Sequence, residues 1–482
     1  DDAFYMLQVA RELASGAAFR TPYGSPTTGV QPLMTLIYAL LHLASSTLGL
    51  DRWWIMRLVL ILNGILFVTF CSLMAAIAKR EDIHLSNGSY PFLVGMLALF
   101  SFFGFRTFLF GLETSLYLVG LCVFILVCIS PFRLEGDVQA RATPGANSAR
   151  GVLAGFLSLI RIDFLVIFVS YLVLSLWAKV ITLRAAVVQM VIALLITAPW
   201  FVWIFHVTGS IIPSSGAAQA GLESLYQVHS RLGSIVVALV EVGVPIMPVM
   251  GRWPLALIAF AIACILYLVA RSVGAKVKLH PAIWRFGLAV VPLVLIYGGL
   301  FWATHFYARY WSPLIIVALL LWGKAITMVL DSELARKTRM SMRIAILGQT
   351  VVFSAACWYS LHTGREGGSH PVAAGFIEEK GYQPGTIGAF QSGIIGYFHR
   401  GVVNLDGKLD HQALRALKEN ELHKYVDERG LMILIDWQES LDKLPEEWRR
   451  GWVPCGYIDG GSICLRRDVL GASGENWQGG IR

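Results

Sequence analysis

The sequence predicts a mostly α-helical membrane protein with about ten transmembrane helices, outer juxtamembrane helices and a small C-terminal α/β domain. Three observations support this class. Hydrophobic residues make up 56% of the 482 residues, and charged residues only 15%, against about 25% in a typical soluble domain. Long apolar runs recur up to residue 361, and short β-type runs follow them. This composition excludes a single soluble globule, a disordered chain and a disulfide-built secreted module.

Each long apolar run has about the length of a membrane span, because a helix needs about 20 residues to cross the bilayer core. We expect spans near 55–78, 91–108, 113–130, 151–178, 185–206, 253–271, 286–303, 312–330 and 344–361. The run 151–178 could also form two spans that break at Arg161. Residues 32–49 and 233–250 are apolar as well, and we expect them as spans or as helices along the outer interface.

The distribution of positive charge sets the expected orientation. Residues 1–361 carry 25 basic and 14 acidic residues, whereas residues 362–482 carry 14 and 17. Five alternate loops hold most of the basic residues, and the loops between them hold only Arg106, Arg231 and Arg309. Because Lys and Arg collect in cytoplasmic loops, we expect the five loops inside the cell and the C-terminal domain outside it. The excess of positive charge is therefore no sign of nucleic-acid binding, and the expected location is the inner (plasma) membrane.

The chain divides by composition into two expected domains. Residues 1–361 form the transmembrane domain, in which residues 1–54 are the first external loop with its juxtamembrane helices. Because the chain starts at Asp1 on the outer side, we also expect a preceding span. Residues 362–482 form the extracytoplasmic domain, with a helix at His411–Arg429. Its expected strands are Thr386–Phe390, Gly401–Leu405, Leu431–Ile435, Trp452–Ile458 and Ser462–Arg466.

Two of the seven cysteines lie in the C-terminal domain, on either side of the Asp459-Gly460 turn signal. A two-residue turn would pair residue 458 with 461 and Cys455 with Cys464, which is within disulfide reach. The alternative is a pair of free, half-buried thiols. The remaining five cysteines lie in apolar spans, where we expect them to be packing residues.

Ionisable groups at the outer ends of the spans are candidate site residues, because burying a charge beside lipid is costly. We expect them to meet in one polar cavity that opens outward. Asp1 and Asp2 are the candidate catalytic carboxylates. The candidate substrate-binding residues are Glu113, Arg161, Asp163, His206, His229, His305, Arg309 and Tyr310.

Each candidate also has a purely structural interpretation. An Asp at the start of a helix can cap it, and Glu113 in a first helical turn suits the helix dipole. Arg161 and Asp163 could neutralise each other at a helix–helix turn. Arg309-Tyr310 could anchor an interfacial aromatic belt, although the fork of an Arg also suits phosphate recognition.

Several common signatures are absent from the sequence. It contains no HExxH and no paired Cys/His spacing, so we predict no metal site. It contains no GxxxxGK[ST], so nothing indicates an ATP-driven pump. No GxSxG elbow is present either.

Taken together, these motifs resemble the GT-C superfamily of integral-membrane glycosyltransferases, in particular its bacterial mannosyltransferase and arabinofuranosyltransferase members. The resemblance covers most of the chain, and each motif alone is short. It includes an acidic pair (Asp1-Asp2), a Ser/Thr/Pro/Gly stretch (25–33) and a Gly-Leu-Glu-Thr element (111–114). It continues with Arg161-Ile162-Asp163, where members have Arg-Pro-[DE], then the 209–213 loop, Arg309-Tyr310, and the strings at 385–390, 396–398 and 403–407.

The resemblance implies transfer of a sugar from a polyprenyl-phosphate donor to an acceptor hydroxyl at the extracytoplasmic face, with inversion. It implies Asp1 or Asp2 as general base and Arg309, supported by Arg161 or His305, beside the phosphate. Glu113 and Asp163 would orient the sugar or the acceptor.

The implied partners are the lipid-linked sugar, the bilayer and a glycan, lipid or protein acceptor, with no nucleic acid. No cofactor is expected, and the resemblance leaves the need for a divalent metal open. The alternatives are a multi-span secondary transporter, which explains the C-terminal domain poorly, and a non-catalytic scaffold subunit.

Overall fold

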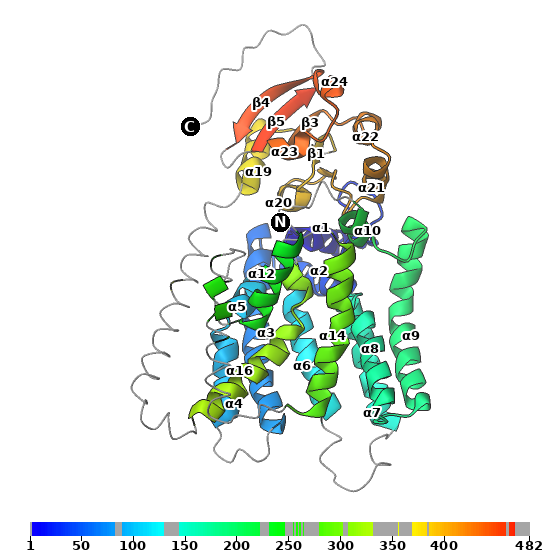
Figure 1. Ribbon diagram of the computed structural model, residues 1–482. Helices are drawn as coiled ribbons and strands as arrows, with labels where there is room; N and C mark the ends of the chain where they lie inside the picture. Colours follow the sequence, from blue (N-terminus) through cyan, green and yellow to red (C-terminus); the bar gives the residue numbers. More distant parts are fainter. Residues whose placement is uncertain are drawn as a thin grey trace. The chain divides into compact units, whose positions relative to one another are not determined.

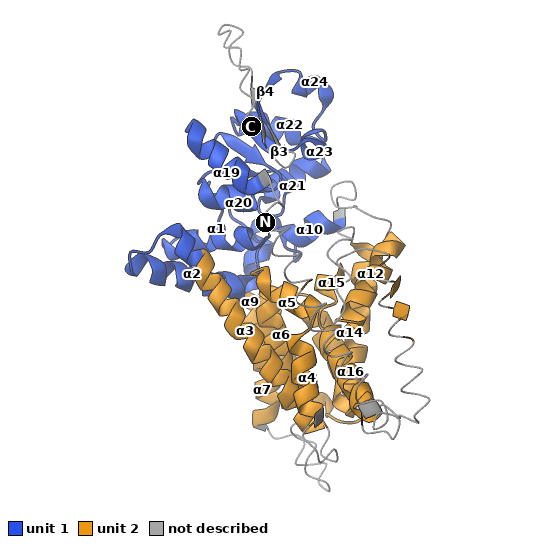
Figure 2. Ribbon diagram, turned by 90° about the vertical axis from the view of Figure 1, so that its left-hand side faces the viewer, with its two compact units in different colours: residues 1–55, 200–225, 360–482 blue, residues 56–199, 226–359 orange. Residues whose placement is uncertain are grey.

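The computed structural model describes residues 2–81, 89–129, 144–221, 231–245, 279–301, 307–330, 369–382, 385–458 and 462–467, with a few isolated positions between them. By their contacts, the residues divide into two compact units (Figure 2). Unit 1 comprises residues 1–55, 200–225 and 360–482, and unit 2 comprises residues 56–199 and 226–359. The N-terminal segment therefore groups with the C-terminal domain, a partition that the composition of the sequence does not indicate.

The described elements of unit 2 are helices, which Figure 1 labels. Two of them, α3 and α9, continue along the chain into unit 1. The helices are α3 (Arg52–Glu81), α4 (Ser89–Leu99), α5 (Phe102–Leu109), α6 (Glu113–Ile129), α7 (Pro144–Ile160), α8 (Phe164–Trp177), α9 (Leu183–Thr208), α12 (Arg231–Gly243), α14 (Pro281–Leu300), α15 (Tyr307–Tyr310) and α16 (Leu314–Leu330).

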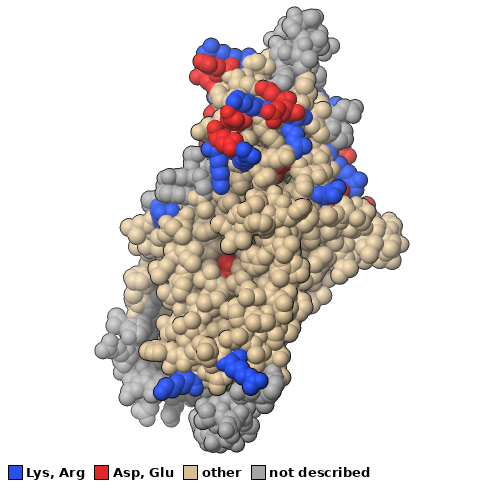
Figure 3. Space-filling view, turned by 90° about the vertical axis from the view of Figure 1, so that its right-hand side faces the viewer, with Lys and Arg blue, Asp and Glu red and all other residues tan. Residues whose placement is uncertain are grey.

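Three described helices, α3, α9 and α14, are long and apolar enough to cross a membrane, and the bent pair α4–α5 could form a fourth span. Their outer faces are apolar, as Leu195 and Val202 of α9 illustrate with 68% exposure each. On the face drawn in Figure 3, wide areas carry neither basic nor acidic side chains. Such surfaces are typical of helices that face lipid.

Two expected spans are interrupted in the structure. The run 91–108 bends by 51° between α4 and α5, because Ser101 caps α5 and its side chain accepts a hydrogen bond from Gly104 N at 2.9 Å. The run 151–178 breaks between α7 and α8, at the Arg161 position that the sequence singles out. The expected spans 253–271 and 344–361 lie outside the described residues, apart from isolated positions.

Helices α7 and α9 approach each other closely through glycine. A Cβ on Gly151 would lie 2.8 Å from the carbonyl oxygen of Gln189, and one on Gly155 would lie 2.7 Å from the Cβ of Ile196. The spacing Gly151-x-x-x-Gly155 places both glycines on one face of α7, as in other close helix pairs of membrane proteins.

Unit 1 begins with α1 (Asp2–Ala14) and α2 (Pro32–Thr47) and includes α10 (Ser214–Gly221). Its α/β part contains α19 (Ser369–Lys380), β1 (Ile387–Ala389), α20 (Ser392–Phe398), β2 (Val403–Asn404), α21 (His411–Lys418), α22 (Leu422–Glu428), β3 (Ile433–Trp437), α23 (Gln438–Leu441), α24 (Glu446–Arg449), β4 (Trp452–Ile458) and β5 (Ser462–Arg467).

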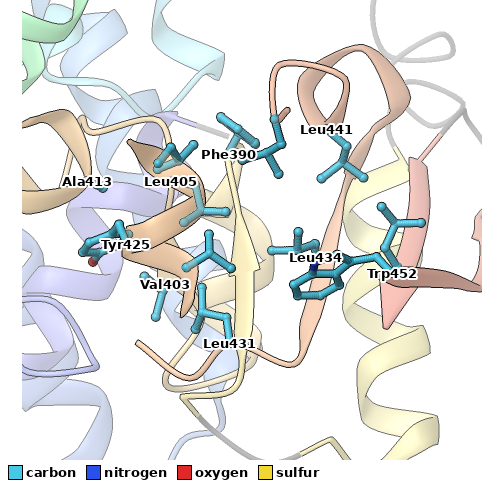
Figure 4. Packing of buried hydrophobic residues seen from close by; sticks show 13 residues of the cluster. Phe390, Val403, Leu405, Ala413, Tyr425, Leu431, Leu434, Leu441 and Trp452 are labelled. Carbon is cyan, nitrogen blue, oxygen red and sulfur yellow. The ribbon is translucent and has the colours of Figure 1, made fainter. Parts of the chain in front are cut away.

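The five strands form one mixed sheet in the order β2-β1-β3-β5-β4. Strand β1 pairs in parallel with β2 and β3, and β5 pairs antiparallel with β3 and β4. Side chains of β3 alternate between two cores: Leu434 packs with Leu405 and Tyr425 on one face (Figure 4), and Ile433 packs with Phe376 on the other. Helices therefore cover both faces of the sheet, as the expected α/β class requires.

Two details of the expected domain are wrong. The single helix at His411–Arg429 is divided into α21 and α22, because Asn420 adopts a positive φ of 56°, a conformation that Asn tolerates better than most residues. The hairpin register is shifted by one, since residue 458 pairs with 462 and a bulge lies between Pro454 and Gly456. Cys464 is disulfide-bonded, and the Cys455 side chain lies outside the described part of the chain.

The glycine contact between α7 and α9 generates a stability prediction. Gly155→Val should lower the thermal midpoint of the detergent-solubilised protein, because its side chain would overlap Ile196. Gly145→Ala is the control on the same helix, since its Cβ meets nothing within 4 Å and alanine favours helix by about 1 kcal/mol. Equal midpoints for the two variants would contradict the close packing.

Candidate functional site

A buried carboxylate lies at the start of α6 in unit 2 and binds two arginines. The Glu113 side chain is fully buried. Its Oε1 accepts a hydrogen bond from Arg161 Nη1 at 2.9 Å. Arg309 Nη2 lies 2.9 Å from Oε1 and 2.8 Å from Oε2. Glu113 therefore links the α7–α8 turn to the short helix α15. In the sequence, Arg161 lies 48 residues and Arg309 lies 196 residues after Glu113.

The α7–α8 turn holds a second carboxylate against Arg161. Arg161 Nε donates to Asp163 Oδ1 at 3.1 Å, and Nη2 donates to Oδ2 at 2.6 Å. The hydroxyl of Tyr297 in α14 donates to the same Oδ2 at 2.9 Å. The side chain of Arg161 is only 5% exposed, so its charge is compensated by protein groups instead of water.

Aromatic rings surround this network. Tyr297 stacks on Tyr310 with a centroid distance of 4.0 Å and an angle of 5° between the ring planes. The Arg161 guanidinium lies 5.0 Å from the Tyr310 ring centroid and 5.5 Å from that of Tyr117. Such contacts stabilise a desolvated cation by about 2 kcal/mol or more. The rings also restrict the orientation of the guanidinium.

We refer to Glu113, Arg161, Asp163, Tyr297 and Arg309 as the arginine–carboxylate cluster. Its two positive and two negative charges balance one another. The cluster agrees with the structural interpretations as well, because Arg161 and Asp163 do pair at a helix–helix turn and Glu113 does lie in a first turn. The link to Arg309 goes beyond both interpretations, since it joins a third and distant segment to the pair.

Further buried polar atoms lie beside cluster residues in the sequence. The side-chain oxygens of Thr114, Tyr117 and Ser312 and the indole nitrogen of Trp311 have no hydrogen-bond partner among the described residues. A buried polar atom without a partner is costly. These atoms are therefore candidates to bind water or a polar ligand.

Unit 1 contains a separate charged group at the start of α1. Asp2 Oδ1 lies 3.8 Å from Lys408 Nζ, which lies 3.4 Å from Asp406 Oδ2. Tyr5 directs its hydroxyl to the same Asp406 oxygen at 3.3 Å. Asp2, Tyr5, Asp406 and Lys408 form what we call the Asp2–Lys408 group. Of its members, the sequence analysis named only Asp2 as a candidate site residue, although Asp406 lies in the 403–407 string.

The Asp2–Lys408 group lies at the carboxyl end of the parallel strands, where many α/β proteins bind ligands. Asp406 follows β2, and Asp436 lies near the end of β3. Burial raises the pKa of Asp436 to about 6, and the nearby Asp406 charge acts in the same direction. Its carboxylate accepts backbone hydrogen bonds from Gln391 and Trp437, which favour the ionised form.

The other expected site residues do not join these two groups in the described structure. His206 lies in the last turn of α9 and is exposed, with its ring 6.4 Å from Trp203. Asp1, His229 and His305 lie outside the described residues. Among the described residues, no three His, Cys, Asp or Glu side chains gather closely enough to hold a metal ion.

The structure thus brings together Glu113, Arg161, Asp163, Arg309 and Tyr310 within unit 2, and it places Asp2 in unit 1. Sequence reasoning missed Tyr297, which lies within an apolar run, and it missed Asp406 and Lys408. The 403–407 string carried a signal for Asp406, because it belongs to the motifs of the GT-C resemblance.

Comparison with known proteins supports the fold. Neither a family model nor a curated protein sequence matches this chain. The crystal structure of ArnT from Cupriavidus metallidurans bound to undecaprenyl phosphate matches with a TM-score of 0.58 at 14% identity, and the match covers 96% of this chain and 93% of that one. Its apo state covers 96% and 92% at 13% identity, with a TM-score of 0.45, too low to define a common fold.

The match to the lipid-bound form shows the fold of the chain. The chain has the fold of ArnT, a GT-C glycosyltransferase. The resemblance to the GT-C superfamily that the sequence motifs indicated is therefore confirmed at the level of the fold.

The cluster makes a prediction about stability. Glu113→Gln should destabilise the solubilised protein by about 3–5 kcal/mol, because it leaves two guanidinium groups without their shared counter-charge. Tyr297→Phe removes one hydrogen bond to a charged group and should cost about 1.5–3 kcal/mol. Thermal or denaturant unfolding of both variants measures the difference. If Glu113→Gln were the more stable variant, Glu113 would not be the anchor of the cluster.

Proposed function

We propose that the protein is a glycosyltransferase that moves a sugar from a polyprenyl-phosphate donor to an acceptor hydroxyl. The observation that carries the proposal is the match of almost the whole chain to a structure bound to undecaprenyl phosphate. The arginine–carboxylate cluster supports it independently, because buried arginines at helix ends suit a lipid phosphate.

Arg309 is the residue that we assign to the donor phosphate. Its side chain is 16% exposed, against 5% for Arg161. Arg161 uses Nε, Nη1 and Nη2 on the two carboxylates, and Arg309 holds both oxygens of Glu113 through Nη2. When the bond between the sugar and the phosphate breaks, negative charge grows on the phosphate, and a fixed guanidinium stabilises it.

Glu113 and Asp163 hold the arginines in this proposal. The full burial of Glu113 between two guanidinium groups favours an anchoring role over the contact with a sugar hydroxyl that the sequence suggested. Asp163 and Tyr297 restrain Arg161 in the same way. A fixed array of charges needs little reorganisation during the reaction, which is the main advantage of such sites.

Asp2, or its neighbour Asp1, acts as the general base. It takes the proton from the acceptor hydroxyl, the oxygen attacks the anomeric carbon, and the lipid phosphate leaves from the opposite side with inversion. In this proposal, proton removal is the role of the Asp2–Lys408 group. The acceptor would be a glycan, a lipid or a protein.

We place the reaction at the extracytoplasmic face of the inner membrane. The uneven distribution of Lys and Arg between alternate loops supports this orientation. The C-terminal domain and α1, which share unit 1, would then both lie on that side.

The general-base role predicts the effect of removing one charge. Asp2→Asn, and Asp1→Asn in parallel, should identify the base, with the essential variant losing transfer by about 10²–10⁴-fold. The assay is transfer from a panel of polyprenyl-phosphate sugars, and the thermal midpoint serves as the folding control. Full activity in both variants would remove the general-base role.

The phosphate contact makes a second prediction. Arg309→Ala should weaken binding of undecaprenyl phosphate, whereas Arg231→Ala should not, because Arg231 contacts the carbonyl of Phe301 and lies outside the cluster. Binding can be measured by thermal stabilisation at increasing lipid concentration. Unchanged affinity in Arg309→Ala would refute the assignment.

A further inference from the structure

The C-terminal domain supplies a lysine that pairs with Asp2. Lys408 Nζ lies 3.8 Å from Asp2 Oδ1 and 3.4 Å from Asp406 Oδ2. The Lys408 side chain is only 7% exposed, whereas that of Asp2 is 22% exposed. Attraction between opposite charges at this distance is weak in water and stronger where one partner is buried.

A neighbouring side chain and two distant segments of unit 1 fix the backbone of Lys408. Its amide donates to Asp406 Oδ1 at 2.9 Å, and its carbonyl accepts from Ser214 Oγ at 2.8 Å. A Cβ on Gly29 would lie 1.8 Å from the Lys408 carbonyl oxygen, so only glycine permits this approach. These contacts fix the backbone of Lys408, whose side chain is buried.

Helix α1 is held against the same domain by its own polar side chains. Tyr5 contacts Asp406, Gln8 Nε2 donates to the carbonyls of Ser392 and Gly393 at 2.8 and 2.7 Å, and Arg11 Nη1 donates to the carbonyl of Tyr397 at 2.7 Å. A side chain on Gly396 would displace Gln8, since its Cβ would lie 2.7 Å away. The domain therefore fixes both Asp2, through α1, and Lys408.

We infer that Lys408 is a positioning residue that keeps the Asp2 carboxylate ionised and oriented, and that Asp406 limits this effect by sharing the lysine. The inference deepens the proposed function and rests on it for its catalytic meaning. An ionised, oriented carboxylate can accept a proton from an acceptor hydroxyl. A lysine bound to Asp2 alone would make that carboxylate a weaker base, so the competing Asp406 preserves its basicity.

Other charged and titratable groups of the described residues lie on α1, on the elements packed against it, or around Asp406. They are Tyr5, Arg11, Glu12, Tyr38, His42, Tyr397, Arg400, Asp436 and Lys443. Lys443 is the matched comparison for Lys408. The charges of Asp436 and Asp406 act on its ammonium group, and its Nζ lies 6.0 Å from the Phe390 ring centroid. No ion pair of Lys443 is found among the described residues.

The test measures the ionisation of Asp2 directly, without the need for a substrate. A water-soluble carbodiimide with glycine ethyl ester labels protonated carboxyl groups, and fragment mass spectrometry assigns the label to Asp1 or Asp2. The whole protein in detergent is labelled over a range of pH. Lys408→Met should move the labelling midpoint of Asp2 up by about one pH unit, and Asp406→Asn should move it down.

The control and the outcomes separate the inference from the proposed function. Lys443→Met should leave the midpoint of Asp2 in place, and Lys408→Arg should restore it. Shifts of the Asp2 labelling midpoint in opposite directions for Lys408→Met and Asp406→Asn support the inference that the two carboxylates share Lys408. A midpoint that stays in place in both variants, or moves in the same direction in both, overturns it. If the midpoints move as expected but Asp2→Asn and Asp1→Asn keep full transfer activity, the proposed function fails and the electrostatic arrangement remains.

Discussion

The structure of unit 2 depends on the burial of one carboxylate between two guanidinium groups. Glu113 opens α6 in an apolar bundle, where an isolated charge would cost several kcal/mol. Arg161 and Arg309 compensate that charge, and each of them would be equally costly alone. The three side chains therefore specify one another, and they fix the positions of the α7–α8 turn and α15 relative to α6.

The same constraint explains why the surrounding groups are aromatic. The Tyr297 hydroxyl donates a hydrogen bond to the Asp163 carboxylate, and its ring stacks on the Tyr310 ring. One residue therefore both stabilises a charged group and packs against an aromatic neighbour. Rings of this kind leave the arginines few other orientations. In the proposed reaction, a phosphate ligand would meet charges that are already in place, which is the reason that we assign phosphate binding to this cluster.

Much of the fold could be predicted from the sequence, because hydrophobic length and charge reveal helices and their interruptions. The break at Arg161 and the five short strands are examples. The bend at Ser101, the division at Asn420 and the bulge beside Cys455 could not be predicted, since each depends on a single local hydrogen bond or dihedral angle. The ionisable residues of the cluster stood out in apolar surroundings, but their partner Tyr297 did not. Lys408 looked like an ordinary residue of a soluble domain, and its contacts with Asp2 and Asp406 became visible only in the structure.

The most direct measurement is a density map of the protein with added undecaprenyl phosphate. The account predicts that the phosphate lies within hydrogen-bond distance of the Arg309 guanidinium, with Glu113 still bound to both arginines. A lipid phosphate bound to other residues, with the arginine–carboxylate cluster closed and unchanged, would contradict it.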